Sequence, residues 1–110
     1  TIDGIANSSA NRLLYVRFLS NTISWTNNIV TNTAGMWSNQ SKTSIPTFLN
    51  NLYFNFAGGK NVVEAGTPGN LFTDNAGAWI STSPYANPGT SNFKLNDDYK
   101  GKGYGDPRWN

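Results

Sequence analysis

The side chains that could do chemistry in this sequence are few, because it contains neither cysteine nor histidine. Without a thiol or an imidazole, thiolate nucleophiles, imidazole-based serine triads and the usual transition-metal ligands are excluded. Acid–base catalysis near neutral pH would therefore have to use carboxyl groups. The chain has six of them, at Asp3, Glu64, Asp74, Asp97, Asp98 and Asp106.

Two such carboxyl groups, held roughly 5 to 10 Å apart, could hydrolyse a glycosidic bond. Asp97 and Asp98 are adjacent, so on a strand they would face opposite ways. A catalytic pair would need Glu64, Asp74 or Asp106 to be brought close by the fold. Aspartates at turns usually accept backbone hydrogen bonds instead, and we predict no catalytic residue.

Coordination of Ca²⁺ is a second role that carboxylate and amide oxygen atoms can have. Asn96-Asp97-Asp98 and the pair Asp74-Asn75 could both supply ligands to Ca²⁺. Neither has the spacing of an EF-hand loop, which runs over about twelve residues. The alternative is an ordinary turn, and we predict no metal and no cofactor.

Binding through aromatic and amide side chains is the chemistry that the last third of the chain favours. Tyrosine and tryptophan rings offer flat apolar faces, while asparagine and aspartate offer hydrogen bonds, and antibody combining sites use a similar mixture. A neutral sugar needs both kinds of contact. The predicted ligand-binding residues are Asn96, Asp97, Asp98, Tyr99, Tyr104, Asp106, Arg108 and Trp109.

The tail GKGYGDPRWN, residues 101–110, carries half of that set. Its three glycines allow positive φ and close approach to another surface, which a free linker with aromatic neighbours would not need. We therefore expect the tail to be docked, either on its own domain or on a second copy of the chain.

The composition limits the class of protein. Charged residues make up 13% of the chain, about half the usual ~25%, and aromatic residues make up 14%. A net charge of +2 gives little attraction to phosphate, and no apolar run approaches ~18 residues. We expect one folded domain, residues 1–110, that neither binds nucleic acid nor inserts into a membrane.

Secretion is the predicted localisation. Lysine and glutamate are scarce, and two glycosylation sequons are present, Asn7-Ser8-Ser9 and Asn39-Gln40-Ser41.

The predicted elements are mixed. Residues 12–19 read as a strand that is apolar on both faces, as in the centre of a covered sheet. Residues 22–37 carry apolar side chains at helical spacing, which predicts a helix capped by Asn21, with a hairpin turning at Asn27-Asn28 as the alternative. No internal repeat is evident in this reading.

A second helix is predicted after Ser44, with Pro46 in its first turn and Gly58-Gly59 at its end. Phe54 would point to the polar side, as an interface residue or a packing contact with a loop. The buried face would hold Phe48, Leu49, Leu52, Tyr53 and Phe56.

Short strands follow at residues 62–63, 78–82 and 93–95, separated by Pro and Gly turns. Two helices and a strand apolar on both faces predict an α/β fold of the αβα-sandwich type, with a sheet of about four strands and a helix on each face. The alternative is an α+β fold with both helices on one face.

These features together resemble the small secreted mushroom lectins: a cysteine-free, Asn-rich chain of this length that ends in an aromatic, glycine-rich tail. The resemblance covers the whole chain but no motif, so no binding residue is carried over from it. It implies an αβα sandwich that dimerises through its sheet. It also implies binding to oligosaccharides with N-acetylhexosamine, with fucose as a further candidate, and no catalysis or metal.

The leading hypothesis is a secreted, fungal-type lectin that forms a homodimer and binds glycans of glycoproteins or cell surfaces. A small carboxylate-dependent glycoside hydrolase is one alternative. A non-catalytic toxin or adhesin module is the other, because the composition also allows it.

Overall fold

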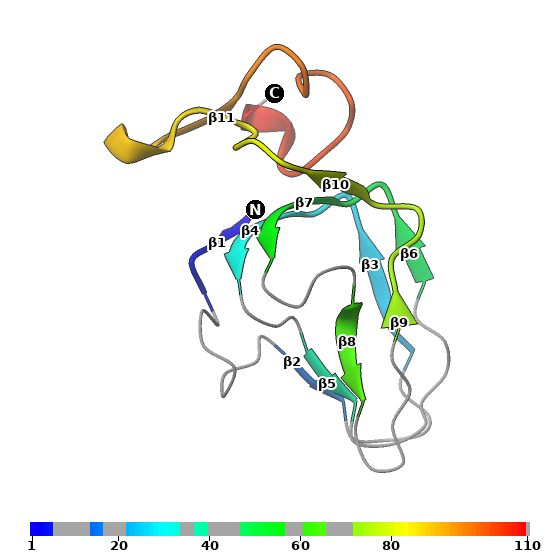
Figure 1. Cartoon of the computed structure of the whole chain (residues 1–110). Coiled ribbons are helices and arrows are strands. Elements are labelled where there is room, and N and C mark those ends of the chain that lie inside the picture. The colour runs from blue at the N-terminus through cyan, green and yellow to red at the C-terminus, as the bar shows by residue number, and fades with distance from the viewer. Residues whose placement is uncertain are drawn as a thin grey trace.

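A computed structural model describes residues 1–5, 14–16, 22–33, 37–39, 47–56, 61–65 and 72–109. Its framework is a coil of short strands that stack on one another in parallel (Figure 1). The predicted αβα sandwich is wrong, because the described residues form strands and contain no helix of seven or more residues. The alternative α+β arrangement is wrong for the same reason.

Three sheets make up the faces of the coil. The first has the order β1-β4-β7-β10, from Ile2–Asp3, Ile29–Thr33, Leu52–Phe56 and Ala78–Ile80. The second contains β2, β5 and β8, from Leu14–Val16, Trp37–Asn39 and Asn61–Ala65. The third pairs β3 with β6, from Ser24–Thr26 and Thr47–Leu49.

Strands within each of these sheets are neighbours in space but lie one coil apart in the chain. Coil one is β1, β2 and β3, coil two is β4, β5 and β6, and coil three begins with β7 and β8. All these pairings are parallel, which is the topology of a parallel β-helix. The regular coil ends at β9, Phe72–Thr73, which runs antiparallel to β8.

An internal repeat, which the sequence analysis missed, underlies this fold. Residues 25–33, WTNNIVTNT, align with residues 48–56, FLNNLYFNF, at a spacing of 23. Three asparagines coincide, and hydrogen bonds join each one to its partner in the next coil. A period in this range is typical of solenoid proteins, in which each repeat packs only on its neighbours.

The asparagines also explain why both predicted helices are wrong. Asn27 and Asn50 have φ of 56° and 52°, at the corner that leads into the first sheet. Asn32 and Asn55, with φ of 54° and 49°, form the corner that leaves it. Asparagine tolerates this left-handed conformation better than most residues. Each corner interrupts the alternation of a strand, so the apolar residues recur at a spacing that imitates a helix.

The hairpin alternative is also wrong, although Asn27-Asn28 does form a turn. β3 pairs with β6, and β4 pairs with β1 and β7, so the two strands flanking this turn are not hydrogen-bonded to each other. The predicted capping residues Asn21 and Ser44 lie outside the described residues, as do Pro46 and Gly58-Gly59.

The predicted strands agree with the structure. β2 lies within the predicted strand 12–19, whose other residues are outside the described part. β8, β10 and β12 confirm the strands predicted near residues 62, 78 and 93.

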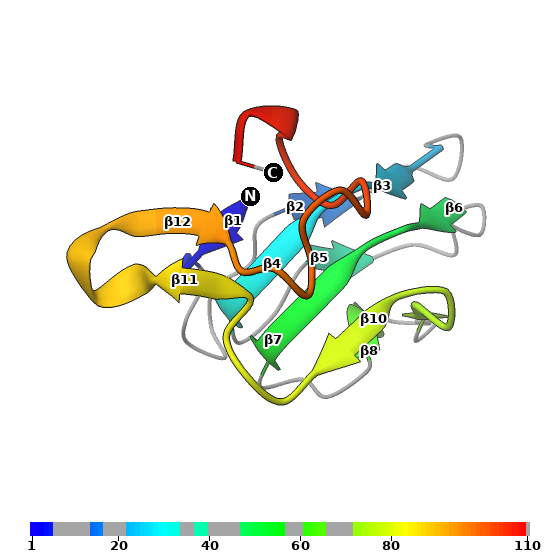
Figure 2. The same cartoon turned by 90° about the horizontal axis from the view of Figure 1, so that it is seen from above.

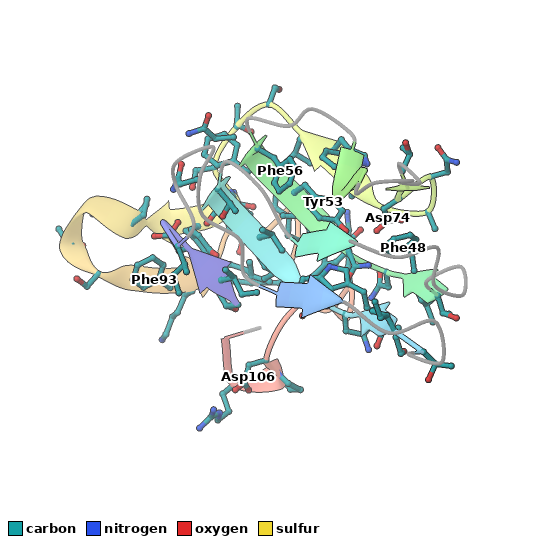
Figure 3. All side chains as sticks on the ribbon, turned by 90° about the horizontal axis from the view of Figure 1, so that it is seen from below. Phe48, Tyr53, Phe56, Asp74, Phe93 and Asp106 are labelled. Carbon is teal, nitrogen blue, oxygen red and sulfur yellow. The ribbon has the colours of Figure 1, made fainter. Side chains whose placement is uncertain are left out.

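Aromatic side chains fill the inside of the coil. Val30 and Tyr53 are fully buried there, with Ile23, Trp25, Phe48, Phe56 and Trp79 packed against them. The Tyr53 and Trp79 rings are stacked at 4.1 Å between centroids, and Figure 3 shows Phe48, Tyr53 and Phe56 along this interior. Stacking the same kind of side chain from successive coils gives a continuous core.

The C-terminal arm, residues 81–109, lies over the outer face of the first sheet (Figure 2). It contains the hairpin β11–β12, from Tyr85–Asn87 and Asn92–Leu95, and two short 3₁₀ turns, Pro88–Thr90 and Pro107–Trp109. Its residues make a second, outer core with strands β4, β7 and β10. That cluster comprises Ile29, Leu52, Tyr85 and Leu95, with Ala78, Ile80, Phe93, Tyr99 and Tyr104.

Candidate functional site

Three of the predicted site residues form a turn after β12. The Asn96 amide hydrogen-bonds the Pro84 carbonyl at 2.9 Å, and the Asn96 side chain accepts from the Asp98 amide at 3.2 Å. Lys100 Nζ lies 2.6 Å from the Asp97 carboxylate and holds the pKa of Asp97 below its usual value. This is the ordinary turn that the sequence analysis gave as the alternative to a calcium loop.

The predicted aromatic residues of the arm are largely used for packing. Tyr99 and Tyr104 are half-buried against the outer core, so the arm needs them for its attachment. Lys102 Nζ lies 5.8 Å from the centre of the Tyr99 ring. Trp109 ends the second 3₁₀ turn, and its side chain lies outside the described part of the molecule.

Asp106 and Arg108 form a separate, solvent-facing ion pair. Their side chains are 31% and 82% exposed, and the Arg108 guanidinium contacts both carboxylate oxygens. These hydrogen bonds lower the pKa of Asp106 to about 2, with a smaller contribution from the amino terminus. The carboxylate is therefore already satisfied by its own chain.

The expectation that the tail is docked is confirmed, and it docks on its own chain. The Gly105 amide donates to the Asn27 carbonyl at 2.7 Å, and Asn50 Nδ2 donates to the Lys102 carbonyl at 3.2 Å. A Cβ at Gly105 would lie 2.7 Å from Ile29 Cδ1, and φ there is +65°. Glycine is thus required for this close approach.

A different surface gathers exposed polar groups, at the corner where the first sheet ends. Asn32 Nδ2 donates to Asp3 Oδ1 at 2.7 Å, and Asn55 Nδ2 donates to Asn32 Oδ1 at 2.8 Å. We call Asp3, Asn32 and Asn55 the amide row. Both asparagines are exposed, and Thr31, buried beside them, donates its hydroxyl to the same Asp3 oxygen.

The outer face of the sheet lies beside this row. Asp3, Thr31, Phe54 and Ile80 are register partners across β1, β4, β7 and β10. They alternate with Val30 and Tyr53, which point into the coil, so they face outward. Phe54 is half-buried and belongs to neither core cluster.

Phe54 was predicted to lie on the polar side of a helix, but the element is strand β7, in which Phe54 shares the outer face with Leu52, a residue predicted to lie on the opposite side. The amide row was missed. The recurrence of asparagine at a spacing of 23 was the signal that could have revealed it.

Tyr85 packs on the outer face of the first sheet from β11, as part of the outer core. Its hydroxyl is buried. Burial raises the pKa of Tyr85, the neighbouring Thr31 hydroxyl lowers it, and the charge of Asp3 adds a smaller rise. Tyr85 therefore covers this face from the side of the arm, beside Thr31.

The geometry of this surface is therefore an aromatic ring next to a line of hydrogen-bonding groups. An asparagine side chain offers two donors and a carbonyl acceptor, and the row uses only some of them. Asn55 Oδ1 accepts no hydrogen bond from any described residue, and Asn32 uses one of its two N–H groups. These open groups face solvent.

Comparison of the sequence with known families gives one match. Residues 1–109 match the family described as Domain of unknown function (DUF5123). The chain belongs to the DUF5123 family. No curated protein and no solved structure matches it.

The remaining carboxyl group of the DUF5123 chain considered for chemistry is Asp74, which is buried. It accepts hydrogen bonds from Asn51 Nδ2 at 2.9 Å, Tyr53 Oη at 2.8 Å and the Ala76 amide at 3.0 Å. Its role is structural, at the end of a line of buried side chains. The side chain of Glu64 lies outside the described residues.

The described residues contain no group of three or more acidic side chains that could hold a metal ion. They also include no helix that is both long and apolar enough to span a bilayer.

Proposed function

We propose that the DUF5123 domain is a secreted, non-catalytic carbohydrate-binding domain that holds oligosaccharides on the amide row and Phe54. The observation that carries this proposal is the line from half-buried Asp3 to the exposed Asn32 and Asn55, beside an outward-facing aromatic ring. Sugars present hydroxyl groups along their edges and C–H groups on their faces. An amide line and an aromatic ring match these two surfaces.

The spacing of the row also suits a sugar. Asn32 and Asn55 occupy equivalent corners of adjacent coils, and neighbouring strands lie about 4.8 Å apart. Two amides at this distance can each bond a different polar group of one sugar ring. Oligosaccharides with N-acetylhexosamine are the first candidates, because an acetamido group pairs with a side-chain amide through both its N–H and its C=O.

Four of the six carboxyl groups support the absence of catalysis in this proposal. Asp97 pairs with Lys100, Asp106 pairs with Arg108, and Asp74 is buried with three hydrogen bonds. Asp3 accepts hydrogen bonds from the Thr31 hydroxyl and the Asn32 side-chain amide. Each of these carboxyl groups already has a partner in the protein.

The test is a glycan array followed by calorimetry on the best ligand, with and without a chelator. We expect Phe54→Ala and Asn55→Gly each to weaken binding about tenfold, since a central contact contributes on the order of 1 kcal/mol or more. Glycine accepts the positive φ at position 55 and removes only the amide.

Leu49→Ala is the matched control. Leu49 is 58% exposed, close to the corner formed by Asn50 and away from the amide row, so its removal should leave affinity unchanged. Circular dichroism must show that all three variants are folded. Binding to no glycan, or equal losses in Leu49→Ala and Phe54→Ala, would refute the proposal, and cleavage of the bound oligosaccharide would favour the hydrolase alternative.

A further inference from the structure

The first coil leaves two hydrogen-bonding groups open at its edge, and they are of opposite kinds. Inside the corner, Asn28 Nδ2 donates to Asn51 Oδ1 at 3.1 Å, and Asn51 Nδ2 donates to Asp74 Oδ2 at 2.9 Å. This inner ladder runs in one direction, from donor to acceptor toward the C-terminus. Its first acceptor, Asn28 Oδ1, receives no hydrogen bond from any residue that the structure describes.

The neighbouring ladder at the same corner runs the other way. Asn50 Nδ2 donates to Asn27 Oδ1 at 3.0 Å, toward the N-terminus. Asn27 Nδ2 is then the first open donor, because its only described side-chain hydrogen bond is through Oδ1. The edge of coil one therefore presents a donor at Asn27 and an acceptor at Asn28.

An Asn-Asn dipeptide fits these two groups. At the boundary between the two coils that carry one, the first asparagine of the earlier pair, Asn27, accepts from Asn50, and the second, Asn28, donates to Asn51. A dipeptide one coil earlier would accept from Asn27 Nδ2 and donate to Asn28 Oδ1. In the same position, its second residue would also donate its backbone N–H to Asn28 Oδ1, as Asn28 does to Asn51 at 2.9 Å.

We propose that the edge formed by β1, β2, β3 and the Asn27-Asn28 corner is a stacking surface for a further coil of parallel β-helix that carries Asn-Asn at its corner. The three strands are the outermost members of their sheets, so their outer edges can add a strand in the way the coils already add to one another. The side-chain ladders fix the register.

A second copy of this chain fits the surface less well. The last coil has Thr73-Asp74 in place of Asn-Asn, and the Asp74 carboxylate is an acceptor with no N–H to donate to Asn28 Oδ1, so stacking head to tail does not match both groups. In a two-fold contact, β1 would pair antiparallel with β1 of the other copy. The two Asn27-Asn28 corners would then lie at opposite ends of the joined sheet.

The test is a fusion that supplies the coil. Ile2 pairs with Val30, so the first sheet has an offset of 28 residues between coils one and two, whereas β2–β5 and β3–β6 are offset by 23. A duplicate of residues 1–28 joined directly ahead of Thr1 places its own Asn27-Asn28 in the required register. The matched control carries Asn27→Ala and Asn28→Ala in the duplicate alone, and the starting chain is measured beside both.

We expect the fusion to unfold at a higher urea midpoint than the starting chain, with an m-value raised by roughly a quarter, because m scales with the surface exposed on unfolding. Amide exchange at Asp3, whose N–H faces the outer edge because the Gly4 amide donates to the Thr31 carbonyl of β4, should slow by more than tenfold in the fusion, and the control should lose most of this protection. Two results would overturn the proposal: unchanged exchange at β1 in the fusion, or sedimentation showing that the starting chain is a dimer whose β1 edge is protected.

Discussion

The inner ladder and the amide row use the same side chain at the same spacing, yet they differ in what surrounds them. Asn51 is fully buried, and its side chain makes four hydrogen bonds, to Asn28, Trp25 and Asp74. Asn55, four residues later, is exposed and donates only to Asn32. A repeat that stacks asparagine in every coil therefore produces one line that holds the fold and another that solvent and ligands can reach.

The largest effect we expect separates these two lines directly. Asn51→Ala should lower the free energy of unfolding by about 4 kcal/mol, since it removes several buried hydrogen bonds and leaves partners such as the Trp25 carbonyl unsatisfied. Asn55→Gly should cost less than about 1 kcal/mol. Urea unfolding followed by tryptophan fluorescence measures both, and equal losses would mean that burial does not distinguish the ladders.

A smaller effect concerns the end of the inner ladder. Tyr53→Phe removes a buried hydrogen bond to Asp74 and should cost about 1.5 kcal/mol at neutral pH. Burial, followed by the hydrogen bond to Asp74, raises the pKa of Tyr53 far above its usual 10.0.

This pKa shift predicts a pH dependence with a definite sign. Above pH 10 the unfolded chain loses the Tyr53 proton while the folded chain keeps it, so stability falls as pH rises. Tyr53→Phe should make the decline between pH 10 and 11 shallower. If the stability of Tyr53→Phe falls with pH at the same slope, another group causes the alkaline loss of stability. Tyr85 is then the next residue to replace.

The smallest expected effect concerns the corner that lies between these two extremes. Asn27 and Asn50 form an amide pair like the exposed row, but the docked tail touches both of them. Gly105→Ala would force a Cβ against Ile29 and loosen this cover, whereas Gly101→Ala, at φ +70°, meets open space.

Both glycine variants carry the strain of positive φ. The difference between their free energies of unfolding therefore isolates the contact of the added Cβ with Ile29. We expect Gly105→Ala to cost about 1 kcal/mol more than Gly101→Ala. Exchange of the amide at position 105 should also be faster in Gly105→Ala, because the tail is more loosely attached there. Equal costs would show that the tail contributes nothing to this corner.

How far the sequence could predict this structure depends on the region. The C-terminal arm follows ordinary rules: β12 and the turn at Asn96 were read correctly from alternation and turn residues. The coils were not, because the helix reading took Leu49 and Leu52 as one buried face with Tyr53. In the structure Leu49 is exposed, Leu52 lies under the arm and Tyr53 points inside.

The candidate site shows the same limit. Tyr99 and Tyr104 looked available because they lie in a glycine-rich segment, but the outer face of the first sheet is apolar and needs cover. The amide row depends on contacts between residues 23 to 29 positions apart. In the sequence, only the repeat relates these distant residues to one another. Aligning the chain with itself would have revealed that repeat.

The C-terminal arm also has a consequence for how the molecule comes apart. In a plain solenoid each coil touches only its neighbours, so coils can peel away one at a time from an end. Here one segment packs on Ile29 in the second coil and Leu52 in the third, and its end lies beside Thr1 in the first. The arm fastens successive coils together, and we expect the described coils to lose their structure as a single cooperative unit.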